Sequence, residues 1–206
     1  MGGHDPYSAS KGCAELVTAA FRDSFFAKNT GGRNQPLIAT VRAGNVIGGG
    51  DWAEDRLIPD VIRAASAQEK VKSRNLHSIR PWQHVLEPVS GYLLLAQKLY
   101  EEGVAYAEGW NFGPDDEDVK PVQWIVERII QQCSNGASWE LDQGNNPHEA
   151  HYLKLDCSKA KKHLGWYPKL KLIDALENTV AWHQAYLGDD DMRVFSLNQI
   201  LGFRDK

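Results

Sequence analysis

The chain has 206 residues, 42% of them hydrophobic and 24% charged, which is typical of a globular protein and excludes a disordered chain. The net charge of -4 lacks the basic excess that nucleic-acid-binding proteins need, so we expect small molecules as partners. No apolar run approaches the roughly 20 residues of a membrane-spanning helix, and the first residues do not have the pattern of a signal peptide. The 3 cysteines are far apart, which argues against a disulfide framework and favours a cytoplasmic location.

The first predicted element is a helix that begins at Asp5-Pro6, because Asp is a preferred N-cap and Pro fits the first helical position. Helical spacing of apolar residues extends it to about Asn29, and Thr30-Gly31-Gly32 ends it. The apolar stripe comprises Cys13, Leu16, Val17, Ala20, Phe21, Ser24 and Phe25. The run from Leu37 to Val41 then predicts a strand buried on both faces, as in a parallel sheet. A glycine-rich loop, 44–50, follows it.

Helices and short strands alternate through the rest of the chain. Apolar spacing predicts helices that begin near Pro59, run from Val89 to Tyr100 and from Pro121 to Cys133, and end with a last helix from Leu172 to Leu187. Ile58, Val61, Ile62 and Ala65 share one face of the helix near Pro59. Brief strands are expected at 110–112 and 152–155, and a short helix from Asp156 to Gly165. This alternation indicates an α/β architecture.

Tyr7 and Lys11 form the first candidate catalytic pair. Residues four apart share a helix face, so a phenol and an ammonium group can reach one site. A nearby ammonium favours the phenolate, which would make Tyr7 a usable base near neutral pH. Spacing alone leaves a surface pair at a helix start open. Tyr167 and Lys171 have the same spacing, but Pro168 follows Tyr167 and the context there is a turn.

The surrounding residues resemble a known family. The segment 5–15, DPYSASKGCAE, resembles the active-site helix of extended short-chain dehydrogenases/reductases, with their Y-x-x-x-K motif. Four more segments are similar to landmarks of the sugar-nucleotide dehydratases and epimerases in that family, in the same order: VRAGNVIG at 41–48, RPWQHVLE at 80–87, NFG at 111–113 and LGWYP at 164–168. Several details, such as GGGDW at 48–52 and IRPWQH at 79–84, look like the branch that acts on CDP-glucose.

The resemblance implies a dehydratase mechanism with NAD as cofactor. Tyr7 would take the proton of the sugar C4 hydroxyl while hydride passes to NAD, and Lys11 would hold the nicotinamide ribose. Loss of water across C5 and C6 and return of the hydride to C6 would give a 4-keto-6-deoxy sugar. The family's acid and base for the elimination lie upstream of the tyrosine, so they are not expected in this chain.

The resemblance also suggests the substrate-binding residues. Asn45 would bind the diphosphate from a loop at a strand's carboxyl end, and Arg80 would pair with a phosphate through its donor fork. Arg56, where relatives carry a basic residue, is a further phosphate candidate. His151 lies where some relatives place an arginine against the nucleotide. We expect no metal site, because His148-Glu149-Ala150-His151 is one residue short of an H-E-x-x-H motif.

The predicted fold is the C-terminal part of a Rossmann-type parallel-sheet domain plus a small α/β substrate-binding subdomain. Residues 1–50 would supply the last helix and strand of the Rossmann-type domain. Residues 51–206 would form mainly the substrate-binding subdomain. The chain has no G-x-G-x-x-G fingerprint, so we expect the NAD-binding half to be absent and the isolated chain to be inactive. A homodimer through the Tyr7–Lys11 helix is expected from the family. A sugar-nucleotide 4-epimerase and a non-catalytic nucleotide-sugar-binding or dimerisation module remain alternatives.

Overall fold

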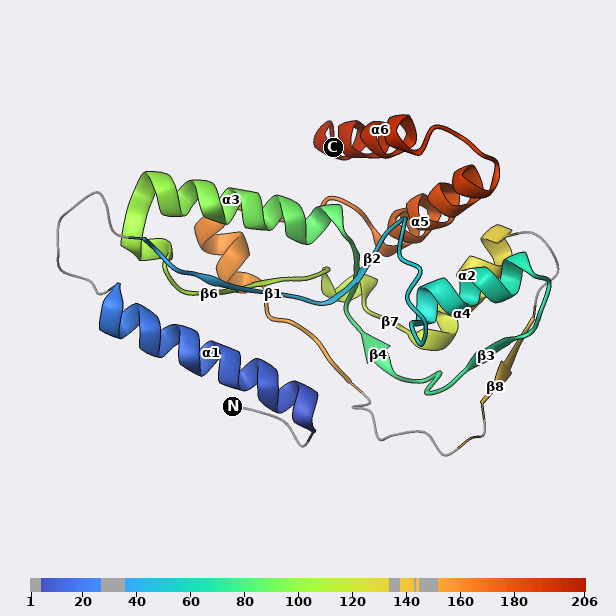
Figure 1. The fold of residues 1–206 in the computed structure, drawn as a ribbon, viewed down its shortest axis with the longest axis horizontal. Coiled ribbons are helices and arrows are strands. Elements are labelled where there is room, and N and C mark those ends of the chain that lie inside the picture. The colour runs from blue at the N-terminus through green and yellow to red at the C-terminus, as the bar shows by residue number, and fades with distance from the viewer. Residues whose placement is uncertain (1–4, 27–35, 134–137, 143, 145–151) are drawn as a thin grey trace. The chain divides into compact units, whose positions relative to one another are not determined.

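The chain divides into two compact units in the computed structural model, which describes residues 5–26, 36–133, 138–142, 144 and 152–206 (Figure 1). Unit 1 is built from Met1–Arg42, Ser90–Phe112 and Cys157–Trp166. Unit 2 is built from Ala43–Val89, Gly113–Asp156 and Tyr167–Lys206. The division predicted at residue 50 separates the Rossmann-type part of the chain from the substrate-binding part. It is a division by function rather than into compact units, and it stays a prediction. No helix in the described part of the chain is both long and apolar enough to cross a membrane.

Unit 1 opens with helix α1 (Pro6–Phe25), which starts where the sequence predicts. The Asp5 side chain accepts a hydrogen bond from the Ser8 backbone at 2.9 Å, and Pro6 occupies the first turn. The helix ends four residues before the predicted Asn29, and the expected Thr30-Gly31-Gly32 stop lies outside the described residues. No residue of α1 is buried, so its apolar stripe faces solvent.

A two-stranded sheet of β1 (Thr40–Ala43) and β6 (Gly109–Phe112) lies in unit 1. Strand β6 confirms the prediction at 110–112. The prediction of a buried strand from Leu37 to Val41 was wrong in two respects. Strand β1 begins three residues after Leu37, and Val41 is 39% exposed rather than buried. A strand of a two-stranded sheet lacks neighbours on one edge, so its side chains are less covered than those of a central parallel strand.

Helix α3 (Leu86–Glu102) begins in unit 2 and continues into unit 1, followed by η1 (Gly103–Tyr106). Its sequence stripe of Val89, Leu93 and Tyr100 lies on the exposed face, while Gly91 and Leu95 are buried. The short helix predicted before Gly165 is present and includes η3 (Ala160–Leu164). Gly165 ends it with a positive φ of 67°, a conformation that glycine adopts without strain.

The core of unit 1 joins two of the segments recognised in the sequence. Phe112 is fully buried and meets Trp166 edge-to-face, with ring centroids 5.0 Å apart. The Trp166 indole N–H donates to Ser90 Oγ at 3.2 Å. A Cβ at Gly91 would lie 2.3 Å from the Phe112 ring, so only glycine lets α3 pack this closely.

The described part of unit 2 contains three strand pairs. Strands β2 (Asn45–Ile47) and β5 (Trp82–His84) are parallel, as are β3 (Val71–Ser73) and β8 (Trp139–Leu141). Strands β4 (Ile79–Arg80) and β7 (Lys120–Pro121) are antiparallel. The sequence predicted none of these six strands, and β2 lies inside the segment expected to be a glycine-rich loop. The strand predicted at 152–155 is reduced to a bridge between Tyr152 and Ile79.

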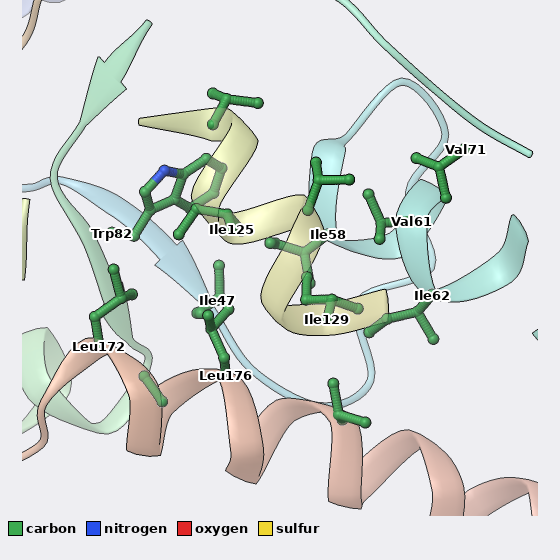
Figure 2. Close-up of a cluster of buried hydrophobic side chains, with 14 of the residues drawn as sticks. Ile47, Ile58, Val61, Ile62, Val71, Trp82, Ile125, Ile129, Leu172 and Leu176 are labelled. Atoms are coloured by element: carbon green, nitrogen blue, oxygen red, sulfur yellow. The ribbon is translucent and has the colours of Figure 1, made fainter. Parts of the chain in front are cut away.

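Helices α2 (Leu57–Ser66), α4 (Val122–Cys133) and α5 (Leu172–Leu187) build the core of unit 2 (Figure 2). The predicted inward face of α2 is buried, and the bounds of α5 match the predicted ones. Among the described residues, 15 buried side chains form the main cluster, including Ile47, Ile58, Trp82, Ile125, Ile129 and Leu176. Burial of such side chains is worth about 1.5–3 kcal/mol each, so this cluster supplies much of the stability of unit 2.

The α-helix that follows α5 was not predicted. After α5, the chain forms α6 (Met192–Arg204), so α5 is not the last helix. Asp191 caps α6 by accepting hydrogen bonds from the backbone N–H groups of Arg193 and Val194. Unit 2 also contains η2 (Asp116–Asp118), in an acidic stretch of the sequence.

Candidate active site

The structure brings Tyr7 and Lys11 together on the exposed face of α1. The Lys11 ammonium lies 5.2 Å from the centroid of the Tyr7 ring, and 72% of Tyr7 is exposed. The shared helix face predicted from the spacing is therefore confirmed. The matched pair of Tyr167 and Lys171 differs, because Tyr167 lies outside regular structure and Lys171 binds Glu117.

Interactions of Asp5 and Glu15 fix the helix that carries this pair. The Ser8 backbone and hydroxyl groups both donate to the Asp5 carboxylate, and these bonds lower the pKa of Asp5. Farther along α1, Glu15 accepts a hydrogen bond from Thr40 Oγ1 at 2.8 Å and forms an ion pair with Arg42 at 3.0 Å. Arg42 belongs to the VRAGNVIG segment, so this arginine joins β1 to the helix of the candidate base.

Asn45 lies at the start of strand β2 rather than in a loop, which corrects the prediction. Its backbone N–H donates to Pro81 O at 2.8 Å, and it is in register with Trp82. Gly44 makes this approach possible, because a Cβ there would lie 2.2 Å from Pro81 O. The structure thus places Asn45 beside the segment that carries Arg80.

Arg80 lies in β4 and is half-buried, and its guanidinium donates to Ile79 O at 3.0 Å. Directly opposite in the antiparallel ladder is Lys120 of β7. Sequence reasoning did not select Lys120, because nothing in its local pattern indicates that β4 and β7 pair. Trp82, which the sequence placed beside Arg80, is 8% exposed and belongs to the core.

Of the remaining two predicted residues, Arg56 and His151, the structure describes Arg56. Arg56 is exposed at the N-terminus of α2, where its side chain makes no capping hydrogen bond. His151 lies outside the described residues, as do His148 and Glu149. Its neighbour Tyr152 forms a parallel bridge with Ile79, and Leu153 N–H donates to Ile79 O at 3.2 Å.

His84 is a buried imidazole that sequence reasoning missed, although it lies within the RPWQHVLE segment. It is 2% exposed, and burial lowers its pKa to about 4. Its Nδ1 accepts the Leu86 N–H at 3.4 Å, so Nε2 carries the proton. That Nε2 has no hydrogen-bond partner among the described residues and would lie 4.0 Å from a Cβ at Gly48.

The sequence comparisons agree with the motifs. Residues 1–179 match the sequence model of the family described as GDP-mannose 4,6 dehydratase. Over 200 residues, 97% of this chain and 56% of the relative, the chain is 56% identical to a CDP-glucose 4,6-dehydratase of Salmonella typhimurium. It is 27% identical over 190 residues, 86% of this chain and 51% of the relative, to a dTDP-glucose 4,6-dehydratase of Haemophilus influenzae. The chain thus spans about half the length of the curated relatives it matches.

Solved structures share the fold. A dTDP-glucose 4,6-dehydratase from Bacillus anthracis, in complex with NAD, matches with a TM-score of 0.70 and 20% identity over 92% of this chain and 55% of that one. A UDP-glucuronic acid 4-epimerase from Bacillus cereus matches with a TM-score of 0.72 and 17% identity, over 88% of this chain and 53% of that one. These likenesses confirm the predicted α/β, Rossmann-type class. Together with the match over residues 1–179, they lead to one conclusion: the chain belongs to the GDP-mannose 4,6 dehydratase family.

Proposed function

We propose that this chain supplies the catalytic pair and the substrate-binding part of a CDP-glucose 4,6-dehydratase, a lyase. The observation that carries the reaction type is the Lys11 ammonium beside the exposed Tyr7 ring on one helix face. The 56% identity to the Salmonella typhimurium relative, over nearly the whole chain, supports CDP-glucose as the substrate. The product would be CDP-4-keto-6-deoxyglucose.

In this proposal Tyr7 is the base that takes the proton of the sugar C4 hydroxyl. Because 72% of its side chain is exposed, the phenol can reach a bound sugar. Lys11 makes no ion pair with a described carboxylate, so its ammonium can donate to ribose hydroxyls, which fits NAD as cofactor. NAD, when bound, supplies a hydride acceptor and returns the hydride, so no net oxidation occurs.

The substrate contacts come from unit 2. Arg80 would bind a phosphate through its planar fork, and Asn45 would donate its side-chain amide to the diphosphate. Arg56 and His151 are retained as further candidates, the first for a phosphate and the second for the nucleotide. The β2–β5 ladder supports the joint role of Asn45 and Arg80, because it fixes the start of β2 next to Pro81.

Calorimetric titration of the chain with CDP-glucose, UDP-glucose, dTDP-glucose and NAD tests the substrate. We expect selective binding of CDP-glucose, lost in Arg80→Ala and kept in Arg193→Ala, a control on the exposed start of α6. Equal binding of the three nucleotide sugars would contradict the substrate assignment. Binding that survives Arg80→Ala would contradict the role of Arg80.

We also propose that the chain forms a homodimer through α1. Leu16, Phe21 and Phe25 on α1 are each more than half exposed, and Leu93 and Tyr100 of α3 are 68% and 93% exposed. Exposed apolar stripes of this kind mark interaction surfaces. The three cysteines form no disulfide, which supports the proposed cytoplasmic location.

A further inference from the structure

The segment GGGDW at 48–52 takes no part in the proposed chemistry, yet it packs closely on helix α5 of the same unit. A Cβ at Gly49 would lie 2.0 Å from Cγ of Trp182, so only glycine lets the backbone rest on this indole ring. The segment connects two candidate substrate residues, because it follows strand β2, which begins at Asn45, and precedes Arg56 at the start of α2. Its packing therefore bears on the geometry of substrate binding.

The Trp52 side chain joins a cluster of rings on α5. Its ring centroid lies 4.8 Å from that of His183, with perpendicular planes, and 5.0 Å from that of Tyr186, separations at which aromatic rings attract each other. Tyr186 in turn stacks on Trp182 with centroids 5.8 Å apart. Burial lowers the pKa of His183, so the imidazole stays neutral at pH 7 and packs as an aromatic ring. Trp52 is thus held by its ring, although 45% of it is exposed.

The backbone of Trp52 is tied to helix α2. The Arg63 guanidinium donates to Trp52 O at 2.9 Å and to Ala53 O at 3.5 Å. An ion pair with Asp60, one turn earlier on α2, orients the same guanidinium. Trp52 is therefore fixed from two sides, with its ring on α5 and its carbonyl group on α2.

Three residues after Trp52, the backbone takes a conformation that sets the direction of Arg56. Asp55 has a φ of 59°, in the left-handed region that residues other than glycine seldom adopt. Such a conformation persists where the surrounding structure fixes it. Arg56 follows directly as the N-cap of α2, where its side chain is exposed and makes no capping hydrogen bond. The fixed position of Trp52 and the turn at Asp55 together determine how the Arg56 side chain leaves the backbone.

We propose that Trp52 is a positioning residue for Arg56, an inference that rests on the proposed role of Arg56 in substrate binding. The rings of α5 hold the Trp52 side chain, and Arg63 holds its carbonyl group, so the segment that carries Arg56 is in place before the substrate arrives. An arginine fixed in this way loses less entropy when it binds a phosphate. Trp52 acts through Arg56 and does not itself contact the substrate.

Calorimetric titration of the chain with CDP-glucose tests this coupling in Trp52→Ala, Arg56→Ala and the double variant. We expect Arg56→Ala to weaken binding by roughly 10- to 30-fold and Trp52→Ala by roughly 3- to 10-fold. The double variant should bind no more weakly than Arg56→Ala, because Trp52 has no effect once Arg56 is gone. Trp52→Phe keeps a ring and should retain most of the affinity. Trp124→Ala is the matched control, since it removes a half-buried indole from α4 of the same unit and should leave the affinity unchanged.

Hydrogen exchange without ligand, followed by mass spectrometry, tests the same coupling independently of the substrate. Trp52→Ala should raise amide exchange by several-fold at 53–56 and leave exchange in α4 unchanged, which shows that the unit remains folded. Unchanged exchange at 53–56 would overturn the inference even if no nucleotide sugar binds. Losses of affinity that multiply in the double variant, or an equal loss in Trp124→Ala, would overturn it as well. If the coupling holds but CDP-glucose and UDP-glucose bind alike, the inference stands and the proposed substrate fails.

Discussion

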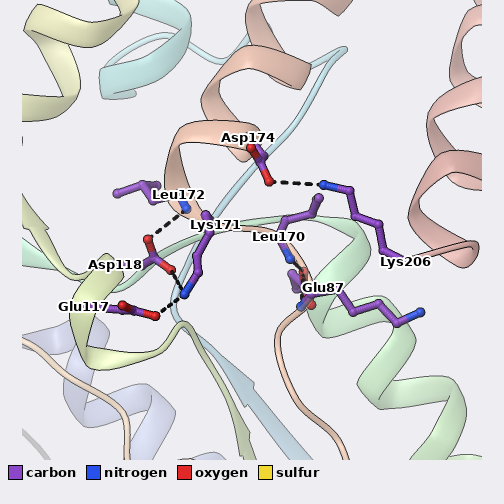
Figure 3. A network of polar contacts seen from close by, with 9 residues as sticks. Glu87, Glu117, Asp118, Leu170, Lys171, Leu172, Asp174 and Lys206 are labelled. Atoms are coloured by element: carbon purple, nitrogen blue, oxygen red, sulfur yellow. Dashed lines mark hydrogen bonds and ion pairs between the residues drawn. The ribbon is translucent and has the colours of Figure 1, made fainter.

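The carboxylate of Glu87 accepts the backbone N–H of Leu170 at 2.7 Å (Figure 3). The same oxygen accepts the N–H of Lys169 at 2.9 Å. Glu87 closes the RPWQHVLE segment, and Leu170 follows the LGWYP segment, so this buried side chain joins two landmarks of the sequence. Burial raises the pKa of Glu87, although both N–H donors and the Lys169 ammonium oppose that rise.

Two substitutions of Glu87 should distinguish the contribution of its hydrogen bonds to stability from the contribution of its charge. We expect Glu87→Ala to lower the free energy of unfolding by about 2–4 kcal/mol, because two buried N–H groups lose their acceptor. Glu87→Gln keeps an acceptor and should stay within about 1 kcal/mol of the wild type at pH 7. Urea denaturation measures both, with exposed Glu69→Gln as the control.

The wild type and Glu87→Gln should also differ in the pH dependence of their stability. A carboxyl group whose folded-state pKa is raised contributes stability below its unfolded pKa and loses it as the pH rises through the folded value. The free energy of unfolding of Glu87→Gln, relative to that of the wild type, should therefore increase as the pH rises above 4.5, the ordinary glutamate pKa. A difference that is constant with pH would show that the carboxyl group does not titrate as its burial requires.

Gly44→Ala should destabilise unit 2. The new Cβ would lie 2.2 Å from Pro81 O, so the bond from Asn45 N–H to that oxygen cannot keep its length. We expect a loss of about 2–4 kcal/mol in thermal unfolding. Gly202→Ala is the control, because its Cβ would meet nothing within 4 Å in helix α6, and it should stabilise by about 0.5–1 kcal/mol. Equal effects of the two substitutions would refute the close approach.

His84 should make the folded protein sensitive to mild acid. Its pKa is lowered from 6.5 to about 4, so the unfolded chain binds a proton that the folded chain refuses between these values. Stability should fall by up to about 3 kcal/mol as the pH drops from 6.5 to 4. His84→Gln should remove this part of the loss, while exposed His77→Gln should not. His183, whose pKa burial also lowers, remains in both variants.

Tyr7→Phe should abolish the chemistry and spare binding. We expect turnover to fall by about 10²- to 10⁴-fold with little change in CDP-glucose affinity, because only the proton acceptor is lost. The rate is measured in a full-length enzyme in which this chain replaces the matching half of the Salmonella typhimurium relative. Tyr167→Phe, which alters the other Y-x-x-x-K pair, should leave turnover unchanged. Full turnover in Tyr7→Phe would remove Tyr7 from the mechanism.

Phe21→Glu should convert the proposed dimer into monomers, because a charge would be placed in an apolar contact. Sedimentation velocity measures the change. Leu197→Glu is the control, since Leu197 is exposed to a similar degree, 47% against 51%, but lies on α6. A wild-type chain that sediments as a monomer over the micromolar range would contradict the dimer proposal.

The sequence predicted long helices better than strands. Helices α2, α4 and α5 repeat apolar residues over several turns, so their periodicity is unambiguous. The strands of unit 2 have two or three residues, too few for an alternating pattern to appear. Helix α6 was missed although Asp191 caps it, because Val194, Ile200 and Leu201 spread over a wide, exposed surface.

The candidate site was predictable where the chemistry is local. Tyr7 and Lys11 meet because helix geometry relates residues four apart. Lys120 and Arg80 meet only through the pairing of β4 and β7, and Glu87 meets Leu170 across a long stretch of chain. Such pairs depend on tertiary structure, which no local pattern specifies.

The three-part construction of unit 1 has a consequence for protein synthesis. Strand β1 leaves the ribosome well before its partner β6, and Trp166, which packs on Phe112, follows later still. At about 5–20 residues per second, the delay from Arg42 to Trp166 is on the order of ten seconds. During that time β1 first lacks its partner β6 and Phe112 then lacks Trp166, so the core of unit 1 is completed only after Trp166 has been synthesised.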